Sequence, residues 1–156
     1  MATSWLQFDL GERAYAIPLS AVAEIMRAQQ PRLIPLVPLS VGGILNIRGE
    51  PLVVLNGGAV FGQGPGLCYR HVLLLEQGDL RIGLRVGQVS RIDHDLAVSR
   101  GRVENVDDEC PFVCRVNRAG ETLGLVELDG FLERATALLT QSRAHQGGLE
   151  KCQEAC

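Results

Sequence analysis

Cysteine and histidine offer this chain its most versatile chemistry, and their spacing suggests a thiol site. Two cysteine pairs share a spacing of four positions, Cys110 with Cys114 and Cys152 with Cys156. Together with His145, such pairs could hold a tetrahedral zinc ion or form a redox couple. Zinc motifs favour ligands on tight turns, whereas a proline and a predicted strand lie between the members of the first pair. A thiol redox or zinc-binding protein therefore stays open as an alternative.

The rest of the sequence does not indicate a set of catalytic residues. The histidines are scattered, and the neighbours of His94, Asp93 and Asp95, project in different directions from it. A solvated loop histidine is the simpler interpretation. The chain has no Gly-x-Ser-x-Gly motif, and the glycine-rich loop 62–66 lacks the Lys-Ser/Thr that a phosphate-binding loop uses. We expect no enzyme activity, no metal and no cofactor.

An arginine at a glycine turn is the strongest candidate for a binding residue. Arg48 and Gly49 separate two apolar runs, 44–47 and 52–55, and this pattern predicts a β-hairpin whose glycine takes a positive φ angle. An unpaired buried guanidinium costs on the order of several kcal/mol, so Arg48 must reach water or a carboxylate. It is predicted to be a surface anchor or half of an ion pair.

The first half of the chain predicts hairpins and one short helix. Residues 5–10 and 13–17 alternate around a Gly-Glu turn, which indicates a hairpin. Apolar residues then follow at helical spacing, namely Leu19, Val22, Ile25 and Met26, and predict a short amphipathic helix. The prolines in 31–38 favour an extended run that leads into the hairpin of Arg48.

The second half predicts further strands and a final helix. Strands are expected at 70–77, 80–86 and 89–92, irregular structure at 93–106, and a last hairpin from two strands, 112–117 and 122–128. A helix capped by Asp129 carries an apolar stripe of Phe131, Leu132, Ala135, Leu138 and Leu139. Many short strands with glycine turns indicate a mainly β fold, a barrel or a sandwich.

Size and charge limit the possible partners. The chain has 156 residues, a formal net charge of −3 and a pI near 5.6, with no basic stripe, so we do not expect nucleic-acid binding. No signal peptide or membrane span is apparent, which predicts a cytoplasmic protein with mostly reduced cysteines. We expect one domain over 1–142, divided into two subdomains at about 57–69, and a flexible tail at 143–156.

The hairpin sequence resembles the signature of the CheW-like family of chemotaxis coupling proteins. The segment 43–49, Gly-Ile-Leu-Asn-Ile-Arg-Gly, fits the family pattern of a glycine step, then apolar-Asn-apolar-Arg-Gly. The resemblance extends over about 6–139. It implies two SH3-like five-stranded β-barrels that share a core, with a groove between them.

The resemblance also implies partners and site residues. CheW-like proteins are adaptors that bind the cytoplasmic hairpin tip of chemoreceptors in the groove and the regulatory domain of a CheA-type histidine kinase at barrel ends. Matched by position, the partner-binding residues are Val22, Glu24, Ile25, Asn46, Arg48 and Gly49. The glutamate and Arg48 would lie close together at the receptor side, either to contact the partner or to hold the helix to the hairpin. The protein would work at receptor arrays on the inner face of the membrane.

Three positions depart from the family pattern. Asn56 and Gly87 stand where aspartates are usual, and Arg85 stands where an aliphatic residue is usual. A charge in that strand indicates an altered surface. The departures therefore leave open a variant that binds only the receptor or only the kinase.

Overall fold

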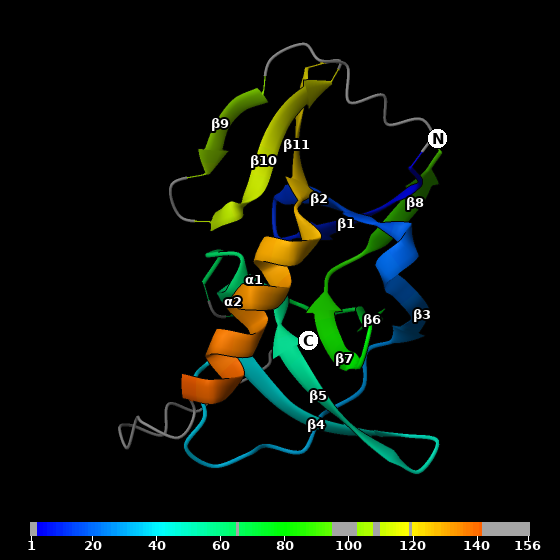
Figure 1. Cartoon of the computed structure of the whole chain (residues 1–156), viewed down its shortest axis with the longest axis vertical. Coiled ribbons are helices and arrows are strands. Elements are labelled where there is room, and N and C mark those ends of the chain that lie inside the picture. Colours follow the sequence, from blue (N-terminus) through cyan, green and yellow to red (C-terminus); the bar gives the residue numbers. More distant parts are fainter. Residues whose placement is uncertain (1–2, 65, 95–102, 108–109, 119, 142–156) are drawn as a thin grey trace.

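Strands make up most of the computed structural model, which describes residues 3–64, 66–94, 103–107, 110–118 and 120–141 (Figure 1). The strands are β1 (Trp5–Leu10), β2 (Arg13–Pro18), β3 (Val22–Arg27), β4 (Val41–Ile47), β5 (Glu50–Asn56), β6 (His71–Gln77), β7 (Leu80–Val86), β8 (Val89–Asp93), β9 (Val103–Asp107), β10 (Cys110–Arg118) and β11 (Glu121–Val126). The helices are a 3-10 turn η1 (Leu19–Ala21), α1 (Gly57–Val60) and α2 (Leu128–Gln141). The predicted mainly β fold class is confirmed.

Two sheets divide these strands. One has six strands in the order β8-β1-β2-β11-β10-β9, and the other has five in the order β3-β6-β7-β5-β4. Each sheet contains one parallel pair, β2 with β11 and β5 with β7. The five-stranded sheet is built from one continuous stretch of chain between β2 and β8. Strands on both sides of 57–69, where a subdomain boundary was expected, pair in this sheet.

The local hairpins were predicted well. The register of β1 with β2 leaves a two-residue turn between Leu10 and Arg13, and that of β4 with β5 leaves Arg48 and Gly49 between Ile47 and Glu50. Both turns depend on short-range signals, namely alternating apolar residues and a glycine at positive φ. The stripe of α2 also lies where expected, since Phe131, Ala135 and Leu138 are buried.

The predicted amphipathic helix after the first hairpin is largely a strand. Only the 3-10 turn η1 is helical, and Val22 begins β3, which pairs with β6. Alternation explains the error, because the partly buried residues of β3 are every second one, Val22, Glu24 and Met26. Val22 and Ile25 are also β-branched, a side-chain type that favours strands.

A second correction concerns the segment that was expected to be irregular. Val103–Asp107 forms β9, which pairs with β10 and gives the first sheet its sixth strand, one more than the family resemblance implied. The sequence of this strand is Val-Glu-Asn-Val-Asp, and its polar residues hid the strand from apolar patterning. The expected tail at 143–156 lies outside the described residues.

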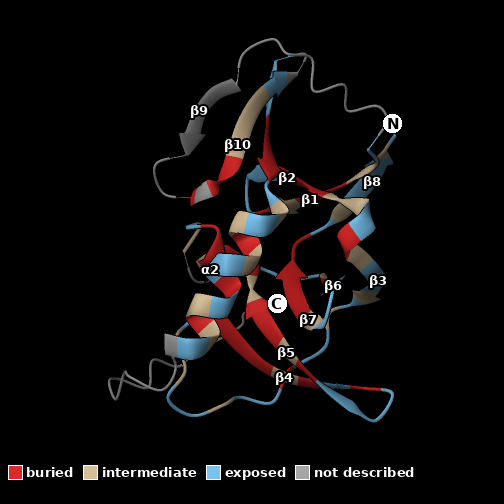
Figure 2. Cartoon of the chain, viewed as in Figure 1, coloured by how far each residue is buried: buried red, intermediate tan, exposed pale blue. Residues whose placement is uncertain are grey.

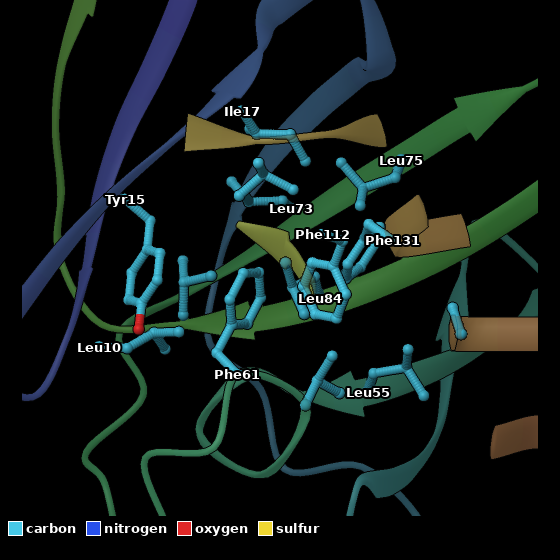
Figure 3. Packing of buried hydrophobic residues seen from close by; sticks show 14 of the residues in the cluster. Leu10, Tyr15, Ile17, Leu55, Phe61, Leu73, Leu75, Leu84, Phe112 and Phe131 are labelled. Atoms are coloured by element: carbon cyan, nitrogen blue, oxygen red, sulfur yellow. The ribbon is translucent and has the colours of Figure 1, made fainter. Parts of the chain in front are cut away.

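An aromatic cluster forms the centre of the molecule, in the buried region that Figure 2 shows in red. The ring of Phe61 lies 4.8 Å from that of Tyr15, 5.4 Å from that of Phe112 and 5.9 Å from that of Phe131. Figure 3 shows these rings packed with leucines from both sheets. Phe61 follows α1, within the segment 57–69 where a subdomain boundary was expected. The core is therefore shared by the two sheets.

Candidate functional site: an arginine turn and its glutamate

The turn between β4 and β5 holds Arg48 in an uncommon backbone conformation. Arg48 has a φ angle of 51° and Gly49 one of 84°, as a type I′ turn requires. A non-glycine residue in this region is disfavoured unless its surroundings hold it there. Here the side chain of Asn46 helps, because its Oδ1 accepts a hydrogen bond of 2.9 Å from the Gly49 backbone N–H. Asn46 thus has a structural role in the site.

Arg48 reaches from this turn to Glu24 in β3. Its Nη2 donates to both carboxylate oxygens of Glu24, at 2.9 Å to Oε1 and 3.0 Å to Oε2. The side chains are 75% and 34% exposed, so the pair faces solvent. The expected proximity of the two residues is confirmed, although Glu24 comes from a strand and not from a helix.

This ion pair joins the two edges of the five-stranded sheet. β3 and β4 are the outermost strands in the hydrogen-bonded order, yet Met26 of β3 packs against a cluster that contains Leu45 and Ile47 of β4. The sheet therefore curls so that residues of both edge strands share one cluster, as in a small barrel. Arg48 and Glu24 close it on the solvent side.

A second group of charges fixes the other side of the same turn. Glu50 pairs with Arg81 of β7, and the Arg81 Nε lies 3.2 Å from Oε1 of Glu76 in β6. These residues were absent from the predicted site. Glu76 and Arg81 are direct cross-strand partners, so the predicted hairpin of β6 and β7 contained a signal for their pairing.

The apolar candidates differ from one another in exposure. Ile25 is 40% exposed, which suits contact with a partner, whereas Val22 is partly buried against the large core cluster. Glu24 and Met26 lie on the same side of β3, opposite Leu74 and Val72; Met26 packs against the barrel cluster, whereas the Glu24 carboxylate reaches Arg48 at the solvent. Ile25 faces the other side.

The β4–β5 hairpin carries the site at its tip. This tip lies at the lower right of Figure 1, at the opposite end of the long axis from β10 and β11. Arg48 lies in the turn of this hairpin, and Glu24 of β3 is its ion-pair partner.

Arg85, which was expected to alter the surface, is buried. It is 4% exposed, with its guanidinium carbon 4.6 Å from the centre of the Tyr69 ring. Its Nη1 donates a hydrogen bond of 3.0 Å to the Oδ1 of Asn56. Two of the three departures from the family pattern therefore contact each other inside the protein. They carry no direct argument for a variant that binds only one partner.

The thiol alternative gains no support from the described residues. Cys110 belongs to the large core cluster and Cys114 packs with a separate small cluster, so the two thiols do not converge. Both are free thiols, whereas Cys68 forms a disulfide, an exception to the expected reduced state. No group of three or more potential metal ligands occurs among the residues that the structure describes. Cys152 and Cys156 lie outside that part of the chain.

These features define a class of protein. Two β-sheets around a shared core display an exposed Arg-carboxylate pair, and an exposed isoleucine lies on the other face of the same strand, features suited to binding another protein. In the described part of the chain, no helix is long and apolar enough to cross a membrane.

The chain belongs to the CheW-like domain family, whose model matches residues 4–96. It is 30% identical over 105 residues to a protein named chemotaxis protein CheW from Treponema pallidum (strain Nichols). That match covers 63% of this chain and 59% of the relative, so the chain spans less than two thirds of the relative's length. CheW-like proteins are non-catalytic scaffolds, in agreement with the expectation that this chain is not an enzyme.

A solved structure has the same fold. The scaffolding protein TtCheW from Thermoanaerobacter tengcongensis superimposes with a TM-score of 0.68 and 22% sequence identity. The match covers 82% of this chain and 86% of the other. At this identity the likeness establishes the fold and nothing about partners, and the two sheets are consistent with the expected SH3-like subdomains.

Proposed function

We propose that this protein is a chemosensory adaptor that couples the cytoplasmic tips of chemoreceptors to a CheA-type histidine kinase. Membership of the CheW-like family supports the scaffolding role. The observation that carries the binding site is the exposed ion pair between Arg48, on the β4–β5 turn, and Glu24 in β3. The protein would work in the cytoplasm, at receptor arrays on the inner face of the membrane.

The proposed receptor contact combines orientation with affinity. The Nη2 of Arg48 contacts Glu24, and the rest of this planar guanidinium can still donate to a carboxylate or a backbone carbonyl of a partner. The exposed apolar atoms of Ile25 can be buried against the partner, and the partly exposed Val22 adds to the apolar area of that contact. Asn46 and Gly49 serve by fixing the turn.

The adaptor does not need a tight individual interface. When a protein binds two partners within one array, each contact raises the effective concentration of the others, so modest affinities add up to stable assembly. Small movements of the receptor can then shift the activity of the kinase through the adaptor, which itself catalyses no reaction.

Equilibrium binding to each partner tests this proposal. The full chain is titrated with a purified receptor hairpin and, separately, with a purified kinase regulatory domain. Binding to both supports the adaptor. Binding to only one shows a one-sided variant, and binding to neither overturns the proposal.

A further inference from the structure

Three exposed leucines lie on a rigid stretch of chain before β4, residues 33–39, which we call the leucine segment. Leu33 is 79% exposed, and Leu36 and Leu39 are also exposed, while Ile34 and Val37 between them pack against the core. Prolines at 31, 35 and 38 restrict the backbone of this segment. Leu36 has a φ angle of 62°, a strained conformation for a leucine, so contacts elsewhere must hold the segment in place.

The hydrogen bonds that hold this segment converge on Asn56 at the end of β5. The Asn56 side-chain Nδ2 donates a hydrogen bond of 2.9 Å to the carbonyl of Leu39, and its backbone N–H donates one of 2.7 Å to the carbonyl of Ser40. At the other end, Arg32 and Ile44 exchange two backbone hydrogen bonds of 2.9 Å. Only the bond from Nδ2 depends on the identity of a side chain.

Arg85 determines how that side chain is oriented. An asparagine amide can be turned over, but the buried guanidinium of Arg85 donates to Oδ1 and therefore directs Nδ2 toward Leu39. Arg85 is in turn supported by the ring of Tyr69, whose hydroxyl accepts a hydrogen bond of 3.1 Å from Gly58 N–H. The chain of contacts runs from the core to the leucine segment.

We propose that Asn56, oriented by the buried Arg85, is the positioning residue that latches the leucine segment to the barrel and keeps its three leucines in one arrangement. The residue type matters. An aspartate at position 56 would still accept from Arg85, but it has no hydrogen to donate and would place an oxygen against the Leu39 carbonyl. This explains why an arginine and an asparagine occur together at two positions that depart from the family pattern.

The latch does not depend on the proposed adaptor function, so it can be tested on the chain alone. Hydrogen exchange is measured by mass spectrometry for Asn56→Asp, which has nearly the same shape as the native side chain. The amides to follow are those of Val41 and Asn56, which donate to Pro38 and Ser40. We expect exchange about fivefold faster there, the factor that corresponds to the loss of one hydrogen bond.

Asn46→Asp is the matched control. It introduces the same charge at the other end of the same hairpin, but the hydrogen bond that the Asn46 side chain makes with the described part of the chain uses Oδ1, an acceptor that aspartate keeps. Exchange at Val41 should therefore stay at the native rate in this variant. Arg85→Lys, which keeps a buried cation but loses the flat stacked group, should give an intermediate rate.

Two results would overturn the latch. One is equal exchange at Val41 in Asn56→Asp and Asn46→Asp. The other is a rise of similar size throughout the β1–β2 hairpin, which would show general destabilisation instead of local release.

Discussion

The carboxylate of Asp9 occupies the space into which any side chain at position 87 would have to project. A Cβ atom at Gly87 would overlap Oδ1 of Asp9 and lie 2.8 Å from its backbone carbonyl oxygen. That oxygen accepts a hydrogen bond of 2.9 Å from Gly87 N–H, and the Oδ1 accepts one of 3.0 Å from Gln88 N–H. The residue that departs from the family pattern is thus paired with a carboxylate from β1.

Substitution at Gly87 should therefore be costly and should depend on Asp9. We expect Gly87→Ala to lower the free energy of unfolding by about 1–3 kcal/mol, the usual cost of overpacking. The same change in an Asp9→Ala background should cost less, because the overlapping carboxylate is gone. Urea denaturation of the four proteins in this cycle measures the coupling. Equal costs in both backgrounds would show that the two residues are independent.

The pair of Arg48 and Glu24 should matter for binding and little for stability. Exposed ion pairs contribute roughly 0.2–1 kcal/mol, so Glu24→Ala or Arg48→Ala should leave the fold intact. Titration with a receptor hairpin should show weakened binding in both variants. The double exchange, Glu24→Arg with Arg48→Glu, restores the internal pair but not the original charge positions. Recovery of binding by this exchange would mean that the residues only hold β3 to the hairpin.

Because the backbone at Arg48 is strained, one substitution there can separate the effect on stability from the effect on receptor binding. Asparagine tolerates positive φ better than arginine, so Arg48→Asn should relieve about 1 kcal/mol of strain and offset the lost ion pair. The melting temperature should not fall, while receptor binding should weaken. Differential scanning calorimetry and a binding titration on the same sample check this. A variant that melts lower and binds normally would contradict both parts of the prediction.

The protein should lose stability in alkali because of Tyr15. Burial raises the pKa of this hydroxyl above its ordinary value of 10.0, against the opposing effect of Arg13. The folded state then keeps its proton at a pH where the unfolded chain releases it. Stability is therefore unaffected below about pH 10 and decreases as the pH rises through the folded pKa. Urea denaturation between pH 8 and about pH 11 should show the decrease for the native chain, and a smaller one for Tyr15→Phe.

Local patterns predicted much of this fold, and long-range contacts account for the errors. The hairpins around Gly11 and Gly49 follow from alternation and turn chemistry, which neighbouring residues determine. β3 was misassigned because Val22, Ile25 and Met26 fit a helical spacing, whereas its pairing with β6 decides the structure. Tertiary pairing outweighs weak local preference in such short segments.

The candidate site was only partly accessible from the sequence. The family resemblance indicated that Glu24 and Arg48 are neighbours, but not that they connect opposite edges of one sheet. Arg85 was expected at the surface, since a charged side chain is rarely buried. Its neighbours, Tyr69 and Asn56, are 16 and 29 positions away in the chain, beyond the reach of local patterns.

Bridging is the property that an adaptor must have, and it can be measured directly. Receptor hairpins displayed on vesicles are sedimented with the kinase regulatory domain, with and without this chain. We predict that the kinase domain sediments only when the chain is present, and that Arg48→Ala reduces the amount recovered. If each partner instead displaces the other from the chain, so that the three never sediment together, the protein does not couple them.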